Sequence, residues 1–317
     1  MTLIRLAPLA GVTDRVFRKL CFEQGCDAAY TEMVSAIGFV YAPQQQATVS
    51  LLERDPNEGP LILQLFGKEP DMMARAAAEL SSRGIYAGID INMGCPARKI
   101  AGAGEGCGLM KTPALAGQIM EAVVRASRLP VTIKCRLGWD ADHINVLELA
   151  HIAEESGISG IAVHGRTREL MYMGSADWDA IAQVKQSVKI PVYGNGDIFS
   201  AEDATRRLEE SGVDGLLIGR GAMGDPWIFR RIRQALHDEP VIETTPQERL
   251  ETILRHYDMM LDWKPQRIAV AEMRKHIAWY LHGLRGAAQL RTRIDRMEDP
   301  NEVKALLTAS ILEEELS

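Results

Sequence analysis

The sequence predicts a TIM barrel, a closed ring of eight parallel strands each followed by a helix, with a small all-helical domain after it. Eight short apolar or β-branched runs alternate with longer segments of helical periodicity, and beyond about Pro240 only helical periodicity remains. Alternation of strand and helix is typical of parallel sheets covered by helices. Eight repeats in this length favour a barrel over an open sheet. We expect the barrel in residues 1–240 and the all-helical domain in residues 241–317.

The expected strands are short. They are residues 2–6, 28–32, 61–66, 89–92, 131–136, 160–164, 191–193 and 215–218. No G-x-G-x-x-G follows the first of them, which argues against a dinucleotide-binding Rossmann domain. In the second domain, Thr245 stands three residues before Glu248, the spacing of a capping box. This spacing predicts a helix that starts at Thr245.

Composition limits the class of protein. The chain is 46% apolar and 25% charged, which is typical of a soluble globular protein, and it has no run of about 18 apolar residues that would span a membrane. The apolar stretch at its start is too short for a signal peptide, so we expect a cytoplasmic location. The five cysteines form no C-x-x-C pair, so neither a disulfide framework nor a zinc site is expected. No obligate protein partner is evident.

Polar residues recur where the expected strands end, and TIM barrels carry their chemistry at these ends. The first strand leads into Pro8, Leu9 and Ala10. The later strand ends contribute Glu32, Gln64, Asn92, Cys95, Lys134, Arg136, His164, Arg166, Asn195, Asp197, Gly219 and Arg220. These residues therefore predict a ring of ligand contacts around one mouth of the barrel.

The last two strand ends have the composition of a phosphate site. "GNGD" and "GRGAMG" follow strands seven and eight, where barrels commonly bind phosphate, and glycines let backbone N–H groups approach an anion. Arg220 could add a fixed charge. Alternation points Lys134 into the barrel mouth, where a lysine needs an anionic partner. Gln64 offers an amide that suits the edge of a planar heterocycle.

Together these groups indicate a phosphorylated planar cofactor. FMN fits the description, with Lys134 stabilising negative charge on the reduced ring, although spacing alone does not separate FMN from other phosphorylated ligands. Cys95 lies between Gly94 and Pro96 at the end of the fourth strand. From the residues alone, Cys95 can be a packed apolar side chain, a nucleophile or a proton donor.

Several segments resemble the tRNA-dihydrouridine synthases, most closely the bacterial B-type branch. They occur in the family's order over nearly the whole chain: "APLAGVTDRVFR", "TEMVSA", "LQLFG", "DINMGCPARKI", "GEGCGLMK", "IKCRLGWD", "HGRTRE", "YGNGDI", "DGLLIGRGAMGDPWIF" and "MRKHIAWYLHGLRGAAQLR". The resemblance implies an FMN-dependent enzyme in which NADPH (or NADH) is the reductant and the 5,6 double bond of specific uridines in tRNA is reduced. It also implies a TIM barrel followed by a helical domain.

The resemblance assigns roles to single residues. Cys95 matches the proton donor for C5 of the uracil, and an ordinary thiol, with a pKa of about 8.5, is protonated at neutral pH. The implied flavin contacts are Pro8, Leu9, Ala10, Gln64, Lys134 and His164, with Asn195, Gly196, Asp197, Gly219 and Arg220 at the phosphate and ribityl end. Asn92 would hydrogen-bond the uracil, and Lys99 and Arg166 would meet tRNA phosphate or the extruded nucleotide. Leu9, Leu170 and Cys107 depart from the family's usual residues.

The distribution of charge fits a tRNA partner better than the net charge of −7 does. Residues 255–296 carry nine lysines and arginines against four acids, with aromatic residues interleaved. Arg274 and Lys275 lie in this stretch, and we expect them to contact tRNA. Three alternatives remain: a flavin barrel that oxidises or reduces free pyrimidines, a phosphate-binding barrel with aldol or isomerase chemistry, and a non-catalytic RNA-binding barrel.

Overall fold

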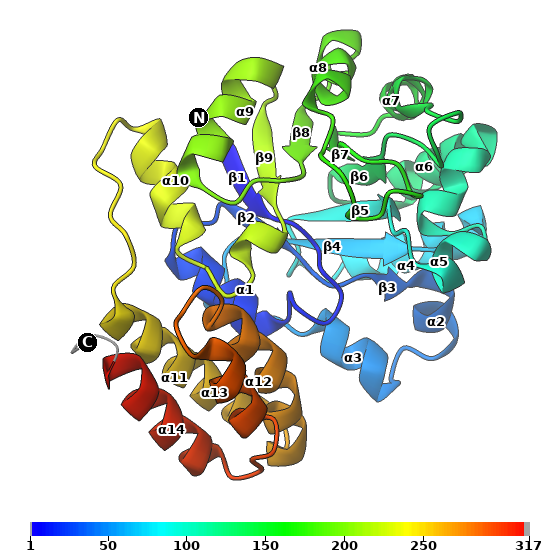
Figure 1. Ribbon diagram of the computed structural model, residues 1–317. Helices are drawn as coiled ribbons and strands as arrows, with labels where there is room; N and C mark the ends of the chain where they lie inside the picture. The colour runs from blue at the N-terminus through cyan, green and yellow to red at the C-terminus, as the bar shows by residue number, and fades with distance from the viewer. Residues whose placement is uncertain (1, 314–317) are drawn as a thin grey trace.

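The computed structural model describes residues 2–313 and contains the predicted barrel. Parallel strands form a ring in the order β2-β1-β9-β8-β7-β6-β5-β4, and pairing of β2 with β4 closes it. The strands are β1 (Leu3–Leu6), β2 (Ala28–Tyr30), β3 (Val34–Ser35), β4 (Leu61–Phe66), β5 (Gly88–Met93), β6 (Val131–Arg136), β7 (Gly160–His164), β8 (Val192–Asn195) and β9 (Gly215–Ile218). Figure 1 shows helices around this ring and a further group of helices to one side.

The second barrel strand is shorter than predicted. Instead of running through residues 28–32, it stops at Tyr30, and pairing with β4 resumes only in β3. At the break, the Oγ1 atom of Thr31 accepts the backbone N–H of Gln64 at 3.0 Å, so a side chain serves as acceptor where a regular ladder uses a carbonyl. The break directs Glu32 toward the first loop, where its carboxylate accepts the N–H of Gly11.

Helices enclose the barrel and extend the chain beyond it. They are α1 (Arg15–Glu23), α2 (Ala36–Tyr41), α3 (Gln46–Leu52), α4 (Pro70–Ser81), α5 (Arg98–Gly102), α6 (Pro113–Ala126), α7 (Val146–Glu155), α8 (Trp178–Ser187), α9 (Ala201–Ser211), α10 (Ile228–Leu236), α11 (Pro246–Trp263), α12 (Gln266–Tyr280), α13 (Ala287–Ile294) and α14 (Pro300–Glu313), with 3₁₀ turns at Gly106–Lys111 and Arg220–Ala222. None of the helices in residues 2–313 is long and apolar enough to cross a membrane.

Side-chain alternation separates two apolar regions in the barrel. On β6, Val131, Ile133 and Cys135 belong to the large core between the strands and the helices. The intervening Thr132 and Lys134 point inward, as the alternation predicts. A smaller apolar cluster, which includes Tyr30 and Tyr193, fills the barrel interior below the mouth. The strands thereby direct alternate residues toward one central site.

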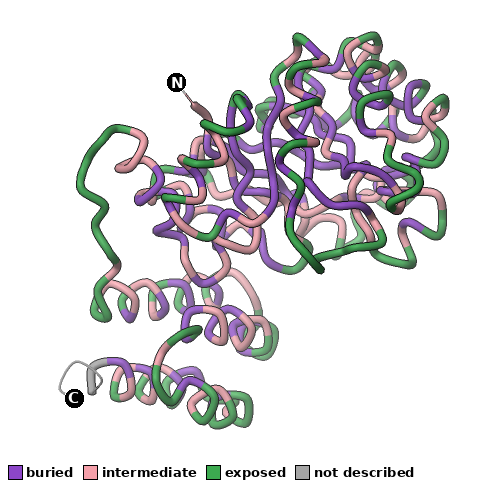
Figure 2. The backbone as a smooth tube through the Cα atoms, turned by 45° about the horizontal axis from the view of Figure 1, so that its top comes forward, coloured by how far each residue is buried: buried purple, intermediate pink, exposed green. Residues whose placement is uncertain are grey.

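The helices after the barrel begin where the sequence predicts. An exposed segment, residues 237–245, leads from α10 to α11. It is the length of green tube at the left of Figure 2. The Oγ1 atom of Thr245 accepts the N–H of Glu248 at 3.1 Å and caps α11. The carboxylate of Glu248 bonds Arg230 of α10 rather than completing the capping box. This ion pair connects the last barrel helix to the helices that follow.

Apolar packing also joins α11–α14 to the barrel. Val16 of α1 and Trp227 belong to the same buried cluster as the core of these helices. In the loop before α10, Gly224 has φ +71°, and a Cβ atom there would lie 2.3 Å from the carbonyl carbon of Trp279. The ring of Phe17 lies 6.1 Å from that of His256. The barrel and the helices therefore meet across a close-packed contact.

Because His256 is buried in this contact, we expect the folded protein to lose stability in acid. Burial lowers its pKa from about 6.5 to about 4, with Asp14 opposing this effect and Lys275 adding to it. Because the folded pKa is lower than the unfolded one, the stabilisation is complete above pH 6.5 and is lost as the pH falls toward 4. We expect protonation of His256 to lower the free energy of unfolding by about 2 kcal/mol when the pH falls from 7 to 5.

Urea unfolding at the two pH values tests this expectation. His256→Leu should reduce the difference in unfolding free energy between pH 7 and pH 5 by about that amount, whatever it does to stability at pH 7. The neighbouring His276, whose pKa burial also lowers, should account for part of the remaining difference. An unchanged difference in the variant would show that His256 is not a source of the acid lability.

Candidate functional site

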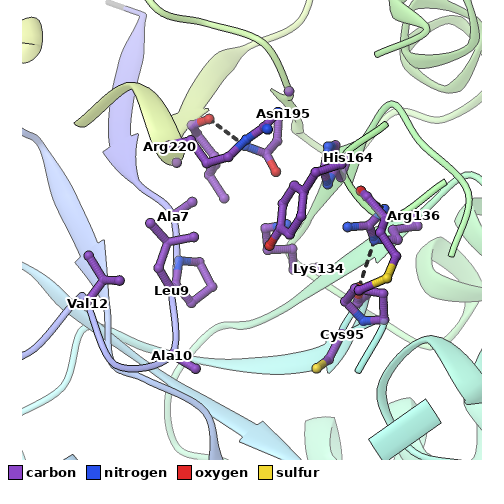
Figure 3. A pocket seen from close by; sticks show the side chains of 18 of the residues that line it. Ala7, Leu9, Ala10, Val12, Cys95, Lys134, Arg136, His164, Asn195 and Arg220 are labelled. Atoms are coloured by element: carbon purple, nitrogen blue, oxygen red, sulfur yellow. Dashed lines mark hydrogen bonds between the residues drawn. The ribbon is translucent and has the colours of Figure 1, made fainter. Parts of the chain in front are cut away.

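A cavity of about 480 Å³ opens at the carboxyl ends of the barrel strands. This volume suits a ligand of the size of a mononucleotide. The predicted residues that line it are Pro8, Leu9, Ala10, Gln64, Asn92, Cys95, Lys134, Arg136, His164, Asn195, Gly196, Asp197, Gly219 and Arg220. Figure 3 shows the first loop along one side of the cavity, with Arg220 and Cys95 toward opposite ends. The structure thus brings together residues from all parts of the barrel.

Backbone contacts fix the loop that carries Cys95. The N–H of Cys95 donates to Oδ1 of Asn92 at 2.9 Å, and its carbonyl accepts the N–H of Cys107 at 3.1 Å. Nε of Arg136 donates to the carbonyl of Gly94 at 3.0 Å. The loop is held from three sides, and the half-buried thiol of Cys95 lies in the cavity wall.

Cys107 differs from Cys95 in exposure. It is fully buried, its Sγ lies 3.8 Å from Sδ of Met110, and burial raises the pKa of its thiol to about 12. All five cysteines are free thiols, and the four other than Cys95 are buried. Cys95 is therefore the cysteine in residues 2–313 that a ligand in the cavity can contact.

Lys134 presents a positive charge to the cavity. Burial, then repulsion from Arg136, lowers its pKa to about 8, while Asp90 opposes the shift. Within the described residues, its Nζ has no hydrogen-bond partner, although it lines the cavity. A lysine that is largely buried and still mostly protonated at neutral pH would be stabilised by an anionic group placed against it. The cavity thus favours a ligand with negative charge at this point.

His164 is a neutral group at the end of β7. Burial, then repulsion from Lys134 and from nearby arginines, lowers its pKa. Its Nε2 lies 3.3 Å from Nη1 of Arg166. Because a guanidinium only donates, Nε2 is the acceptor and the ring proton resides on Nδ1. His164 can therefore donate a hydrogen bond from Nδ1 without carrying charge.

Asp197 organises the opposite end of the cavity. It has φ +51°, and its carboxylate accepts hydrogen bonds from Arg166 at 2.6 Å, Arg220 at 2.9 Å and the N–H of Ala176 at 2.7 Å. Burial opposes ionisation, but the hydrogen bonds from Arg166 and Ala176 and the charges of both arginines hold the pKa of Asp197 below its usual value. Asp197 thus fixes the guanidinium of Arg220 at the cavity wall.

Glycines let the last two loops pack by their backbones at this end. A Cβ atom on Gly221 would lie 2.1 Å from the carbonyl oxygen of Ile198, and one on Gly196 would lie 2.7 Å from Cβ of Ala176. Gly196 also has φ +126°, a conformation that suits glycine. The segments "GNGD" and "GRGAMG" therefore form a close-packed pair of turns, with Arg220 beside them.

Five predicted residues lie outside the cavity lining, and one of them is Glu32, whose carboxylate bonds the first loop. Arg166 is 1% exposed, and besides Asp197 it donates to the carbonyls of Met173 and Gly174. Its guanidinium is thus occupied inside the protein, which suits a role in holding Asp197 rather than a contact with tRNA phosphate. Lys99 is exposed on α5. Arg274 and Lys275 lie on α12 and are not part of the lining.

Sequence reasoning did not predict three residues of the site, Asp90, Tyr172 and Phe199, and it placed Arg136 in the ring of ligand contacts without a specific role. Arg136, Tyr172 and Phe199 line the cavity, and the guanidinium of Arg220 lies 4.7 Å from the ring centre of Tyr172 and 5.6 Å from that of Phe199. Asp90 lies beneath Gln64. Arg136 and Asp90 had a signal in the alternation of their strands, whereas the two aromatic residues lie in loops, where no periodicity identifies an inward position.

Comparisons with known proteins identify relatives of the whole chain. A family model described as "Dihydrouridine synthase (Dus)" matches residues 5–315. A protein of Rickettsia conorii named "Probable tRNA-dihydrouridine synthase" is 43% identical over 95% of this chain and 91% of its own length. A protein of Pseudomonas aeruginosa named "tRNA-dihydrouridine synthase B" is 42% identical over 93% of this chain and 88% of its own length. The sequence resemblance to this family is confirmed.

Solved structures support the barrel fold independently. Histamine dehydrogenase from Rhizobium sp. 4-9 aligns with 81% of this chain at a TM-score of 0.57 and 12% identity. This chain spans about half of that protein, 48% of its length. A variant of NCR from Zymomonas mobilis aligns with 78% of this chain and 90% of its own length, at a TM-score of 0.51 and 14% identity. At such low identity these likenesses concern the fold alone.

Proposed function

This chain belongs to the dihydrouridine synthase family, and from that premise we propose that it reduces the 5,6 double bond of specific uridines in tRNA, with bound FMN as cofactor and NADPH or NADH as reductant. The observation that carries the proposal is the arrangement of the cavity, in which the thiol of Cys95 and the ammonium of Lys134, unpaired within residues 2–313, face the same space. Because tRNA is the proposed substrate, we expect the protein to act in the cytoplasm.

The residues of the cavity fit FMN at both of its ends. Backbone turns at Gly196 and Gly219, with Arg220 beside them, suit a phosphate. Pro8, Leu9 and Ala10 form a wall for the ring, and Lys134 supplies the cation that a negatively charged ring favours. FMN, when bound, supplies the hydride that reaches C6 of the uracil. The protein's part is to hold both rings and to deliver a proton.

The thiol of Cys95 is the proposed source of the proton for C5. Negative charge develops at C5 when C6 receives a hydride, and a protonated thiol in the cavity wall can neutralise it without a metal. Asn92 has one N–H bonded to Gln64, and its Oδ1 accepts from the N–H groups of Gly94 and Cys95. The second N–H of Asn92 faces Sδ of Met33 at 3.6 Å, a weak acceptor that a ring carbonyl of the uracil would replace.

The helices after the barrel form the proposed tRNA surface. The arginines of α13 and its flanks are Arg285, Arg291, Arg293 and Arg296, and within residues 2–313 none of them is in a salt bridge. Nζ of Lys275 lies near the first loop of the barrel, 3.6 Å from the position that a Cβ on Gly11 would take. Arg274 also belongs to this surface, although it donates to the carbonyl of Met297. Lys99 is exposed on α5, which follows the Cys95 loop, and is a proposed tRNA contact separate from the surface of the helices.

Reversing charge on this surface should weaken tRNA binding. We expect the double variant Lys275→Glu, Arg293→Glu to bind tRNA with lower affinity. The slope of log Kd against log salt concentration should also fall by roughly 1 for each phosphate that is no longer neutralised. Arg274 is left in place because it also packs. Arg75→Glu, on the exposed side of α4, is the matched control. Titration of unmodified tRNA at two salt concentrations measures both quantities, and parallel lines for variant and parent would exclude these two residues from the interface.

The function itself is tested with the purified protein. The proposal requires a flavin absorbance spectrum, bleaching by NADPH without oxygen, and reoxidation by unmodified tRNA with formation of one dihydrouridine for each flavin. Reoxidation by a free pyrimidine but not by tRNA would indicate the first alternative activity. A protein that binds no flavin under saturating FMN would point to one of the two flavin-free alternatives.

A further inference from the structure

Asp90 is a fully buried acid that lies below the cavity. It has no role in the proposed chemistry. It lies on β5, where Ile89 and Ile91 point outward into the core and Asp90 and Asn92 point into the barrel. In the sheet it stands between Gln64 of β4 and Thr132 of β6. Burying a carboxylate is costly unless hydrogen bonds compensate, so its contacts are informative.

A continuous chain of hydrogen bonds leads from Asp90 to the Cys95 loop. Oδ2 of Asp90 accepts from Nε2 of Gln64 at 2.8 Å, and Oε1 of Gln64 accepts from Nδ2 of Asn92 at 2.8 Å. Oδ1 of Asn92 then accepts from the backbone N–H groups of Gly94 at 3.1 Å and Cys95 at 2.9 Å. Two side-chain amides thus connect the buried carboxylate to the residue that carries the thiol.

The groups at the two ends of this chain of hydrogen bonds fix the direction in which every bond in it runs. An ionised carboxylate only accepts, so Gln64 must face it with the NH₂ group and offer its oxygen to Asn92. Asn92 must then face Gln64 with its own NH₂ group, which leaves its oxygen for the loop. Backbone N–H groups only donate, so the loop requires the same orientation. Reversal of either amide would place two donors or two acceptors against each other.

The second oxygen of Asp90 is also satisfied. Oδ1 accepts from Oγ1 of Thr132 at 2.6 Å. Burial raises the pKa of Asp90 to about 6, while the hydrogen bonds from Thr132 and Gln64 and the charges of Lys134 and Arg5 oppose the rise. At neutral pH the carboxylate is therefore mostly ionised and acts as an acceptor.

We propose that Asp90 is a positioning residue, whose buried acceptor fixes the direction of the Gln64 and Asn92 amides and thereby holds the backbone of Cys95 in place. The proposal rests on the proposed function only for the consequence that a misplaced Cys95 delivers its proton more slowly. The placement of Cys95 itself can be measured without flavin or tRNA. Asp90 itself does not contact the reacting atoms.

Alkylation of Cys95 by iodoacetamide is the first measurement. Cys95 is the half-exposed cysteine, and the other four are buried, so the reagent reports on the Cys95 loop in the folded protein. Asp90→Ala should raise the alkylation rate by about fivefold, the equivalent of losing one hydrogen bond that holds the loop. Asp90→Asn should stay near the parent rate, because its amide oxygen can still accept from Gln64 while the hydroxyl of Thr132 turns to accept.

The same variants are then compared in two half-reactions. Asp90→Ala should accept hydride from NADPH at the parent rate and be reoxidised by tRNA about fivefold more slowly, and Asp90→Asn should restore most of that rate. Asp14→Asn is the matched control, since Asp14 is a buried carboxylate that caps α1 and an asparagine caps equally well. The control should leave alkylation and both half-reactions unchanged.

The possible outcomes separate this proposal from the proposed function. If Asp90→Ala does not fold, Gln64→Leu interrupts the same chain and should raise alkylation by a similar factor in protein without FMN. Parent-like alkylation in a folded Asp90→Ala or Gln64→Leu protein overturns the proposal. So does an Asp90→Asn protein as impaired as Asp90→Ala, because then the charge, and not the direction of the amides, would be responsible. A parent that fails to act on tRNA would refute the proposed function and leave the alkylation result standing.

Discussion

Replacing Cys95 by alanine is expected to slow the reoxidation of the reduced enzyme by tRNA by about 10²- to 10⁴-fold, the range that a positioned general acid contributes. FMN retention, reduction by NADPH and tRNA binding should stay near the parent values, because none of them uses the thiol. The assay is single-turnover reoxidation by unmodified tRNA without oxygen. The same preparations reduced by NADPH provide the reference rate.

Cys107→Ala is the control for this experiment. Cys107 is adjacent to the Cys95 loop but fully buried, and burial keeps its thiol protonated and out of the cavity. Its removal should change the reoxidation rate little. If the Cys95→Ala enzyme is reoxidised as fast as the parent, another group or a water protonates C5, and Cys95 is a packing residue of the cavity wall.

Arg220→Ala is expected to weaken FMN binding by roughly 10- to 150-fold, which corresponds to about 1.5–3 kcal/mol for one charge-assisted contact with phosphate. The substitution also leaves Asp197 with one arginine fewer beside the phosphate site, which adds repulsion to the loss. Lys134→Ala should weaken FMN binding in the same direction from the other end of the cavity. Titration of the protein without flavin by FMN, followed by flavin fluorescence, gives the dissociation constants.

Arg206→Ala is the matched control for FMN binding. Arg206 is an exposed arginine of α9 that pairs with Asp203, at the surface and outside the cavity lining. It should bind FMN as the parent does. Equal affinity of Arg220→Ala and Arg206→Ala would mean that the phosphate lies elsewhere, and the turns at Gly196 and Gly219 would then be structural only.

The barrel and most of the cavity were predictable because both follow from strand periodicity. Each predicted run contains or overlaps a strand of the ring, and the residues at the strand ends converge because parallel strands in a barrel share one carboxyl edge. The break at Thr31 was not predictable, since it depends on a side chain that replaces a backbone acceptor. A pattern of apolar residues does not reveal that exchange.

The roles of charged residues were harder to predict than their positions. From the sequence, Arg166 is expected to be an unpaired cation that follows a strand. In the structure, the turn at Asp197 places a carboxylate against it. The alternation of side chains along a strand does not predict the geometry of turns. Asp90 lies in the middle of β5, away from the strand ends where ligand contacts gather, so its position suggests no role. Alternation places Asp90 on the same inward side as Asn92, so a signal for its orientation was present in the sequence.

The packing of Gly224 against the backbone of Trp279 has a consequence for target selection. With no side chain between the last barrel loop and α12, the basic helical surface and the Cys95 thiol are held at one separation. Under the proposed function, the place where tRNA binds on the helices then determines which uridine reaches Cys95. We therefore expect that moving arginines to other positions on the helices would select a different uridine, with the barrel unchanged.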